Sequence, residues 1–174
     1  MSWEPHMDLL GNKLAKCAGV LNKLKRFLPL HILRTLYFSM VQSRMTYCIL
    51  TWGFDHYRIE KLQKRFVRII SSSKYNAHSE PLFKVLDILK IEHLFSQNCL
   101  KFVYKFKRCQ LPKHFSSFQC VPRSSIHDHD TRGASQVDTV YTRTDMVSKC
   151  IRSYLPSLIN DTPSQQVYGL TSWY

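Results

Sequence analysis

The side chains best suited to chemistry in this sequence are basic, and they repeat at helical spacing. At about 100° of rotation per residue, residues 57–70 would form a helix with an apolar arc and a separate basic arc. The basic arc holds Arg58, Lys61, Lys64, Arg65 and Arg68. Like charges at this spacing repel by roughly 0.2–0.5 kcal/mol per pair, and a polyanion would remove that repulsion. The pattern predicts a cationic ridge that binds phosphates; an ordinary solvated helix face is the alternative.

The groups that catalysis needs are sparse. Asp128 and Asp130 are the only two carboxylates separated by a single residue, and they lie in a stretch without helical or strand period. A two-metal phosphoryl-transfer site needs carboxylates on rigid neighbouring elements, holding ions roughly 3.5–4 Å apart. Gly-rich phosphate loops and the G-x-S-x-G and H-E-x-x-H motifs are also missing from the sequence. We therefore predict no catalytic residue and no cofactor.

Potential metal ligands do not have the spacing of a metal site. The six cysteines form no C-x-x-C pair. The alternation of His127 and His129 with aspartates is more typical of a polar loop, because a second ligand pair at regular spacing is lacking. We predict no metal site. Cys17 and Cys99 fall on apolar helical faces, which indicates buried thiols.

The positive charge is concentrated in the first two-thirds of the chain. The whole sequence has 25 Lys and Arg against 12 Asp and Glu, a net charge of +13. Residues 1–115 hold 20 basic and 7 acidic residues, and residues 116–174 hold 5 of each. Such a field attracts polyanions, and binding to nucleic acid releases its counterions. Nucleic acid is the favoured partner; a surface that only aids solubility and an anionic membrane are the alternatives.

Neither a membrane span nor a signal peptide is indicated. The longest apolar runs are far shorter than the roughly 18 residues that a span requires. We expect no membrane partner and an intracellular location, in the nucleus, the cytoplasm or both.

Amphipathic helices are the elements that must position these groups. An apolar stripe with alternating spacings of four and three runs along residues 8–27, through Leu10, Leu14, Cys17, Leu21, Leu24 and Leu28. Off that stripe lie further predicted nucleic-acid-binding residues: Lys13, Lys16, Lys23 and Arg26. Pro29 ends the helix. A second helix over residues 30–47 is expected to fold back on the first as an antiparallel hairpin.

The remaining pattern predicts a mainly α protein. Further helices are expected over residues 57–70, 79–86, 92–108 and 146–159, and Ser79 has the character of a helix cap. On the helix over residues 57–70 the apolar arc is Ile59, Leu62, Phe66, Ile69 and Ile70. The polar residues 116–144 read as a long loop. The expected architecture is a small helical bundle: a basic body over residues 1–115, a linker over 116–145, and a short C-terminal helix and tail over 146–174.

Several short motifs follow one another along the chain. They are W-x-x-H within residues 2–7, a stretch over residues 19–29, Y-x-x-x-x-W-G over residues 47–53 and L-Q-x-x-x-x-R-x-I over residues 62–70. Their order resembles that of jockey-like non-LTR retrotransposon reverse transcriptases, in which the W-x-x-H segment opens the thumb.

The resemblance continues into the tail. His127 with Thr131 and Arg132 resembles the H-x-x-x-T-R motif, and residues 156–163 take the place of the last one. The tail departs from the family pattern where His129 stands in place of an aromatic residue, and where a Trp is missing near Ile159.

The resemblance implies a thumb and the region after it, which grip a template–primer duplex through its phosphates. In the family, the fingers and the palm with its magnesium-binding aspartates precede the W-x-x-H segment, and an endonuclease domain often lies further upstream. Because the chain begins two residues before Trp3, we expect a fragment of an RNA-directed DNA polymerase without catalytic residues. It should bind RNA–DNA hybrid or duplex independently of sequence.

Two other functions stay open. Surface left exposed by a missing palm could support self-association, with the apolar stripe of residues 8–27 as the candidate. Burial of that stripe against the second helix is the simpler interpretation. A relic fragment without a selected function is the third interpretation.

Overall fold

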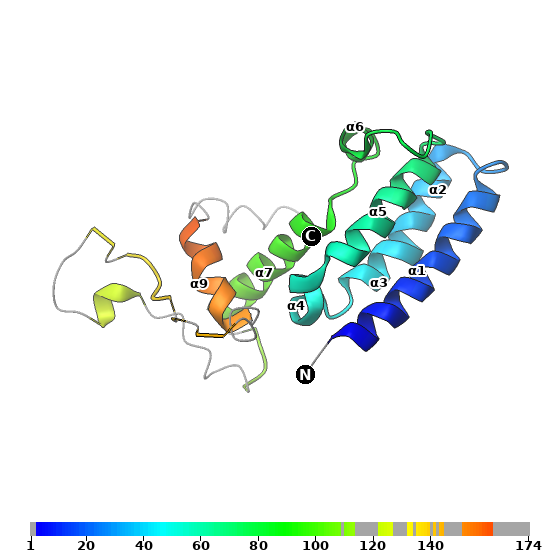
Figure 1. Ribbon diagram of the computed structural model, residues 1–174. Helices are drawn as coiled ribbons and strands as arrows, with labels where there is room; N and C mark the ends of the chain where they lie inside the picture. Colours follow the sequence, from blue (N-terminus) through cyan, green and yellow to red (C-terminus); the bar gives the residue numbers. More distant parts are fainter. Residues whose placement is uncertain are drawn as a thin grey trace. The chain divides into compact units, whose positions relative to one another are not determined.

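The computed structural model describes residues 3–108, 110–113, 122–126, 132–133, 135–139, 141, 143–144 and 151–161. These described residues are mainly helical, with one isolated antiparallel bridge between Pro122 and Val137, which confirms the prediction of a mainly α bundle. The chain divides into two compact units, Met1–Phe95 and Ser96–Tyr174. Figure 1 shows the helices of both units.

The first unit is built on three helical segments that lie side by side (Figure 1). Helix α1 (Glu4–Leu24) and helix α5 (Tyr57–Ile70) run parallel and pack on each other. The segment between them in the sequence runs antiparallel to both. It consists of α2 (Leu30–Leu36), the π-helical turn η1 (Tyr37–Gln42) and α3 (Ser43–Thr46). The predicted hairpin is therefore present, but it is completed by α5 as a third helix.

The apolar stripe of α1 is buried in this bundle. The buried residues of α1 are Met7, Leu10, Leu14, Cys17, Ala18 and Leu21. The expected burial of the stripe is confirmed, but these residues pack mainly on α5, with a smaller contact to η1 of the second segment. A single neighbouring helix would leave one edge of the stripe exposed to water, whereas a third helix buries both edges.

The π-helical turn keeps the second segment in register with the core. The buried residues of that segment are spaced by four: Leu33, Tyr37, Val41 and Met45. In a straight α-helix of 3.6 residues per turn, a spacing of four drifts by about 40° at each step. The wider π turn has more residues per turn and so brings the stripe back to one face. An uninterrupted α-helix over residues 30–47 is thus not what forms.

The chain then closes the end of the bundle. Cys48, at φ 52°, reverses the chain direction between α3 and α4 (Ile49–Trp52), and the 3-10 turn η2 (Gly53–Asp55) follows. Trp52 is buried, and its indole Nε1 donates a hydrogen bond to the carbonyl oxygen of Tyr47 at 2.8 Å.

The later helices lie close to their predicted bounds. Helix α6 covers Ser79–Val85 and helix α7 covers Ile91–Lys107. The residue that caps α6 is His78, without a side-chain hydrogen bond, so the predicted capping role of Ser79 is wrong. No described helix has both the length and the apolar character to cross a membrane.

The second unit contains the C-terminal part of α7, the 3-10 turn η4 (Arg123–Ser125) and α9 (Ile151–Asp161). Cys99, Val103 and Leu155 are buried there. Burial raises the pKa of the Cys99 thiol to about 12, as expected for an unreactive core cysteine. The prediction of buried thiols at Cys17 and Cys99 is confirmed. Fourteen of the 29 residues of the predicted loop, and the start of the predicted last helix, lie outside the described residues.

Candidate nucleic-acid interface

Carboxylates of the protein itself form ion pairs with part of the predicted basic arc of α5. Arg58 pairs with Asp8 of α1 at 2.8 Å, and Lys64 pairs with Glu60 one turn earlier at 2.5 Å. Both pairs reach solvent, and such pairs contribute only about 0–1 kcal/mol to stability. A phosphate can displace these carboxylates, but the two cations are already partly compensated.

Lys61 has an aromatic partner instead. Its ammonium nitrogen lies 4.4 Å from the centroid of the Tyr57 ring, and that ring is 63% exposed. The cation–π contact leaves the charge of Lys61 in place at the surface.

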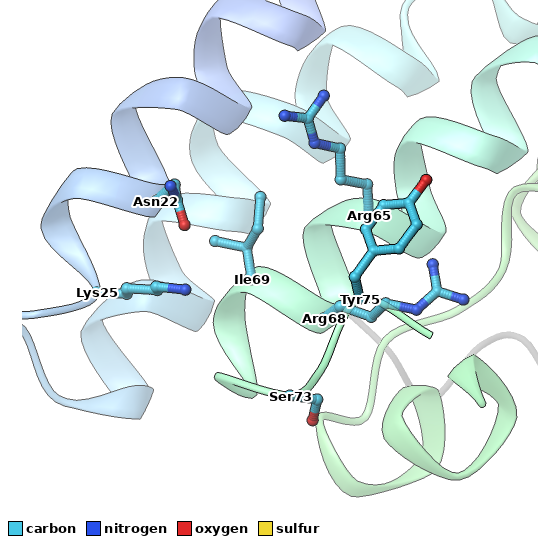
Figure 2. Close-up of a pocket in the computed structure, with 7 residues that line it drawn as sticks. All are labelled: Asn22, Lys25, Arg65, Arg68, Ile69, Ser73 and Tyr75. Carbon is cyan, nitrogen blue, oxygen red and sulfur yellow. The ribbon is translucent and has the colours of Figure 1, made fainter. Parts of the chain in front are cut away.

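Arg65 and Arg68 face the C-terminal end of α1 and meet Lys25 there. The three cations line a pocket of about 200 Å³ (Figure 2). The other lining residues are Asn22, Ile69, Ser73 and Tyr75. Within the part of the chain that the structure describes, the ion pairs use other cations, so these three have no carboxylate partner there. No acidic side chain lines the pocket either.

The pocket wall follows from how α5 ends. Ser72 adopts the left-handed conformation, with φ 52°. The amide of Ser73 donates to the carbonyl of Arg68 at 3.0 Å, and the amide of Ser72 donates to the carbonyl of Ile69 at 3.2 Å. This pair of bonds is the Schellman motif, which satisfies the last carbonyls of a helix. It fixes Ser73 against the end of α5.

A second contact holds the far side of the same loop. The Nε atom of Arg68 donates to the carbonyl oxygen of Ala77 at 2.8 Å. The amide of Ala77 also donates to the carbonyl of Lys74 at 3.0 Å, closing a turn. Tyr75 lies between these fixed points and is 89% exposed. The backbone that carries Tyr75 is thus held at the pocket, and its ring is presented to solvent.

The helix ends offset only part of the positive charge at the pocket. Each helix C-terminus carries about half a negative charge, so α1 and α5 together contribute about −1 near the pocket. Lys25, Arg65 and Arg68 contribute three positive charges. The surplus is about +2, and an anion is the partner that would neutralise it.

The lysines predicted on α1 lie on another side of that helix: Lys13, Lys16 and Lys23. They are exposed, as is Arg26, which follows the end of α1. The side of α1 toward α5 is marked by Asp8, by Gly11, which faces Leu62, and by Asn22. At about 100° per residue, the three lysines point roughly 100° to 180° away from that side. The structure therefore does not join them with the basic residues of α5 into one surface.

Sequence reasoning missed Lys25 and Tyr75. Lys25 follows Leu21 by four positions and so continues the buried stripe, whereas binding residues were sought off the stripe. The available signal was that a basic residue on the core side of a helix end must lie against a neighbouring element. Tyr75 gave no periodic signal, because it stands in a loop.

Residues that carry the family resemblance have packing roles. His6 lies 6.1 Å from Trp3 and 6.2 Å from Trp52, measured between ring centroids. The W-x-x-H spacing thus brings two rings of one helical turn to the end of the bundle. Gln63, from the L-Q motif, is buried in the core.

Among the described residues, no three potential metal ligands come together. The alternating histidines and aspartates of residues 127–130 lie outside the described residues. Comparison with protein-family models, with curated proteins and with solved structures gives no match.

Proposed function

We propose that this chain binds nucleic acid through its phosphates, without sequence preference and without catalysing a reaction. The observation that carries the proposal is the pocket at which Lys25, Arg65 and Arg68 meet without a carboxylate partner among the described residues. The unit that contains it holds 15 basic and 7 acidic residues. Phosphates are the anions that such an arrangement attracts at long range and then binds.

The length of the basic arc suits several consecutive phosphates. Arg58 and Arg68 are ten residues apart on α5, which corresponds to about 15 Å at 1.5 Å per residue. One strand of a duplex rises about 3.4 Å per phosphate, so the arc spans roughly four phosphates. Contacts of this kind position a duplex without reading its bases.

The motif resemblance supports a more specific form of the proposal. In it, the first unit is a thumb-like part of an RNA-directed DNA polymerase of a jockey-like retrotransposon, and its ligand is an RNA–DNA hybrid or duplex. Dissociation constants of about 10⁻⁴ to 10⁻⁶ M are expected for such sequence-independent binding. The protein would act where the nucleic acid is, in the nucleus or the cytoplasm.

The test compares two double variants with the same change in net charge. Lys25→Gln with Arg65→Gln removes two pocket cations, whereas Lys13→Gln with Lys16→Gln removes two from the far side of α1. Fluorescence anisotropy of a labelled duplex, measured over a range of KCl concentrations, gives the salt slope. The pocket variant should reduce the slope by about 1.8, at about 0.9 per lost phosphate contact, and the control much less. Equal reductions would contradict a site at the pocket.

Self-association through the α1 stripe has less support, because the stripe is buried on α5 and η1. Light scattering at two protein concentrations tests it directly. A mass that increases with concentration in the absence of nucleic acid would favour an interaction module.

A further inference from the structure

We infer that the pocket between α1, α5 and the loop after α5 takes one unpaired nucleotide at the end of a duplex. Its phosphate lies among Lys25, Arg65 and Arg68, and its base stacks on the ring of Tyr75. The inference rests on the proposed nucleic-acid binding and adds to it a preferred structure, a junction between duplex and single strand.

The phosphate half of the site rests on charge and room. A pocket of about 200 Å³ far exceeds the roughly 10–15 Å³ that one water needs, so a phosphate group fits. Arg68 commits its Nε atom to the carbonyl of Ala77, which orients the guanidinium and leaves its terminal nitrogens for a ligand. Figure 2 shows Asn22 and Lys25 reaching the pocket from α1, opposite Arg65 and Arg68.

Ser73 lines the pocket, but its hydroxyl does not donate to a phosphate. The hydroxyl of the neighbouring Ser71 donates to the carbonyl of Val67 at 2.9 Å, which uses its only proton. The Ser73 hydroxyl must then be the donor in the 2.8 Å contact between the two serines. The side-chain amide of Asn22 is therefore the neutral donor that accompanies the three cations.

The base half of the site rests on Tyr75. A single exposed aromatic residue is ordinary by itself. This ring, however, lines the same small pocket as three cations, and the Schellman motif and the Arg68–Ala77 bond hold the loop that carries it. Cations beside a presented ring are the combination by which proteins hold single-stranded nucleic acid, since every base has a stacking face.

A base pair inside a duplex cannot use this ring, because both of its faces are covered by its neighbours. The end pair of a blunt duplex has one open face, but pairing fixes its base relative to its phosphate. An unpaired nucleotide can adjust the two independently, and so can place its phosphate in the pocket and its base on Tyr75 together. The remaining basic arc of α5, toward Arg58, is then left for the phosphates of the adjoining duplex.

The experiment measures anisotropy with a blunt duplex and with the same duplex carrying a two-nucleotide overhang. Wild-type protein should bind the overhang duplex about tenfold more tightly, within the range that stacking of one base supplies. Tyr75→Ala should abolish that preference, so that its affinities for the two duplexes agree within about twofold. Tyr75→Phe, which keeps the ring, should retain the preference. Because Tyr75 is 89% exposed, neither variant is expected to disturb folding.

A fluorescent base analogue, 2-aminopurine, in the overhang provides a second readout. Stacking on Tyr75 should change its emission in wild-type protein and in Tyr75→Phe, but not in Tyr75→Ala.

The outcomes separate the two proposals. Failure to bind any duplex at low salt would overturn the proposed function itself. Binding of both duplexes with equal affinity would overturn only the junction site. An overhang preference that survives Tyr75→Ala would also overturn it. A free nucleoside monophosphate that competes as well as the overhang duplex would show a mononucleotide pocket and overturn the assignment to a duplex end.

Discussion

The side-chain amide of Gln63 donates a hydrogen bond to the hydroxyl of Tyr37 at 3.0 Å, within the three-helix core. The same nitrogen donates to the carbonyl of Leu89 at 2.8 Å, and the amide oxygen accepts from the backbone amide of Ile91 at 2.8 Å. Gln63 is 0% exposed. One buried, fully bonded side chain thus joins α5 to η1 and to the start of α7.

Replacing Gln63 by Met should destabilise the protein by about 2–4 kcal/mol, because the buried groups of Tyr37, Leu89 and Ile91 lose their partner. Urea unfolding followed by circular dichroism measures the change. The same substitution in a Tyr37→Phe background should have a smaller effect, since one of those groups is already gone. Strictly additive free energies would show that the two residues are not coupled.

Tyr37 should titrate well above the exposed tyrosines. Burial raises its pKa to about 12, although the hydrogen bond from Gln63 acts in the opposite direction. An unfolded tyrosine titrates near 10. Folding therefore favours the neutral form of Tyr37. The contribution of this residue to the free energy of unfolding is complete below about pH 10 and is lost as the pH rises from about 10 to 12.

Over that interval the unfolded chain releases the Tyr37 proton and the folded chain keeps it. The stability of the wild-type protein should thus fall by up to about 1.4 kcal/mol per pH unit from this residue. The Tyr37→Phe variant should show a correspondingly shallower fall. Ultraviolet titration of phenolate absorbance checks the pKa, and identical pH profiles for the two proteins would contradict this account.

The sequence was enough to predict the helices, but only in part which of their faces are buried. The helical period of its apolar residues was enough to predict α5 at its observed bounds. The core face predicted for it included Leu62 and Ile69, which are only half-buried, and left out Gln63 and Val67, which are buried. A glutamine looks like a surface residue unless its three partners are known, and those partners come from distant parts of the chain.

Only some residues of the candidate site could likewise be predicted from the sequence. Arg65 and Arg68 were predicted, because their spacing on one helix is a local property. Lys25 joins them only once α1 packs parallel to α5, a tertiary arrangement that no local spacing encodes. Tyr75 joins them through the conformation of the loop after α5, which has no periodic pattern.

Ser72→Gly should stabilise the protein by about 0.5–1 kcal/mol. Ser72 has φ 52°, a conformation that costs a non-glycine residue roughly 1–2 kcal/mol, and part of that gain is offset by the greater freedom of an unfolded glycine. The matched control is Ser71→Gly, since Ser71 has φ −77° and lies in the ordinary helical region. That variant should be destabilised. Thermal unfolding of both should show shifts of opposite sign, and shifts of the same sign would refute the strain at Ser72.

Gly53→Ala should destabilise the protein for a reason of space alone, because Gly53 has an ordinary helical φ of −62°. A methyl group there would lie 2.8 Å from Cε2 of Phe95, closer still to its Cδ2, and 3.2 Å from Cγ1 of Ile49. Overpacking of this kind costs about 1–3 kcal/mol.

Gly19→Ala, in the middle of α1, is the matched control for Gly53→Ala. A methyl group at Gly19 meets no atom within 4 Å, so the variant should gain about 0.5–1 kcal/mol from helix propensity. Phe95→Leu removes part of the ring that opposes Gly53, so Gly53→Ala should cost less in that background than in the wild-type protein. Chemical denaturation of the four variants decides the matter. An undiminished cost in the Phe95→Leu background would mean that the ring of Phe95 is not what requires glycine at this position of the W-G motif.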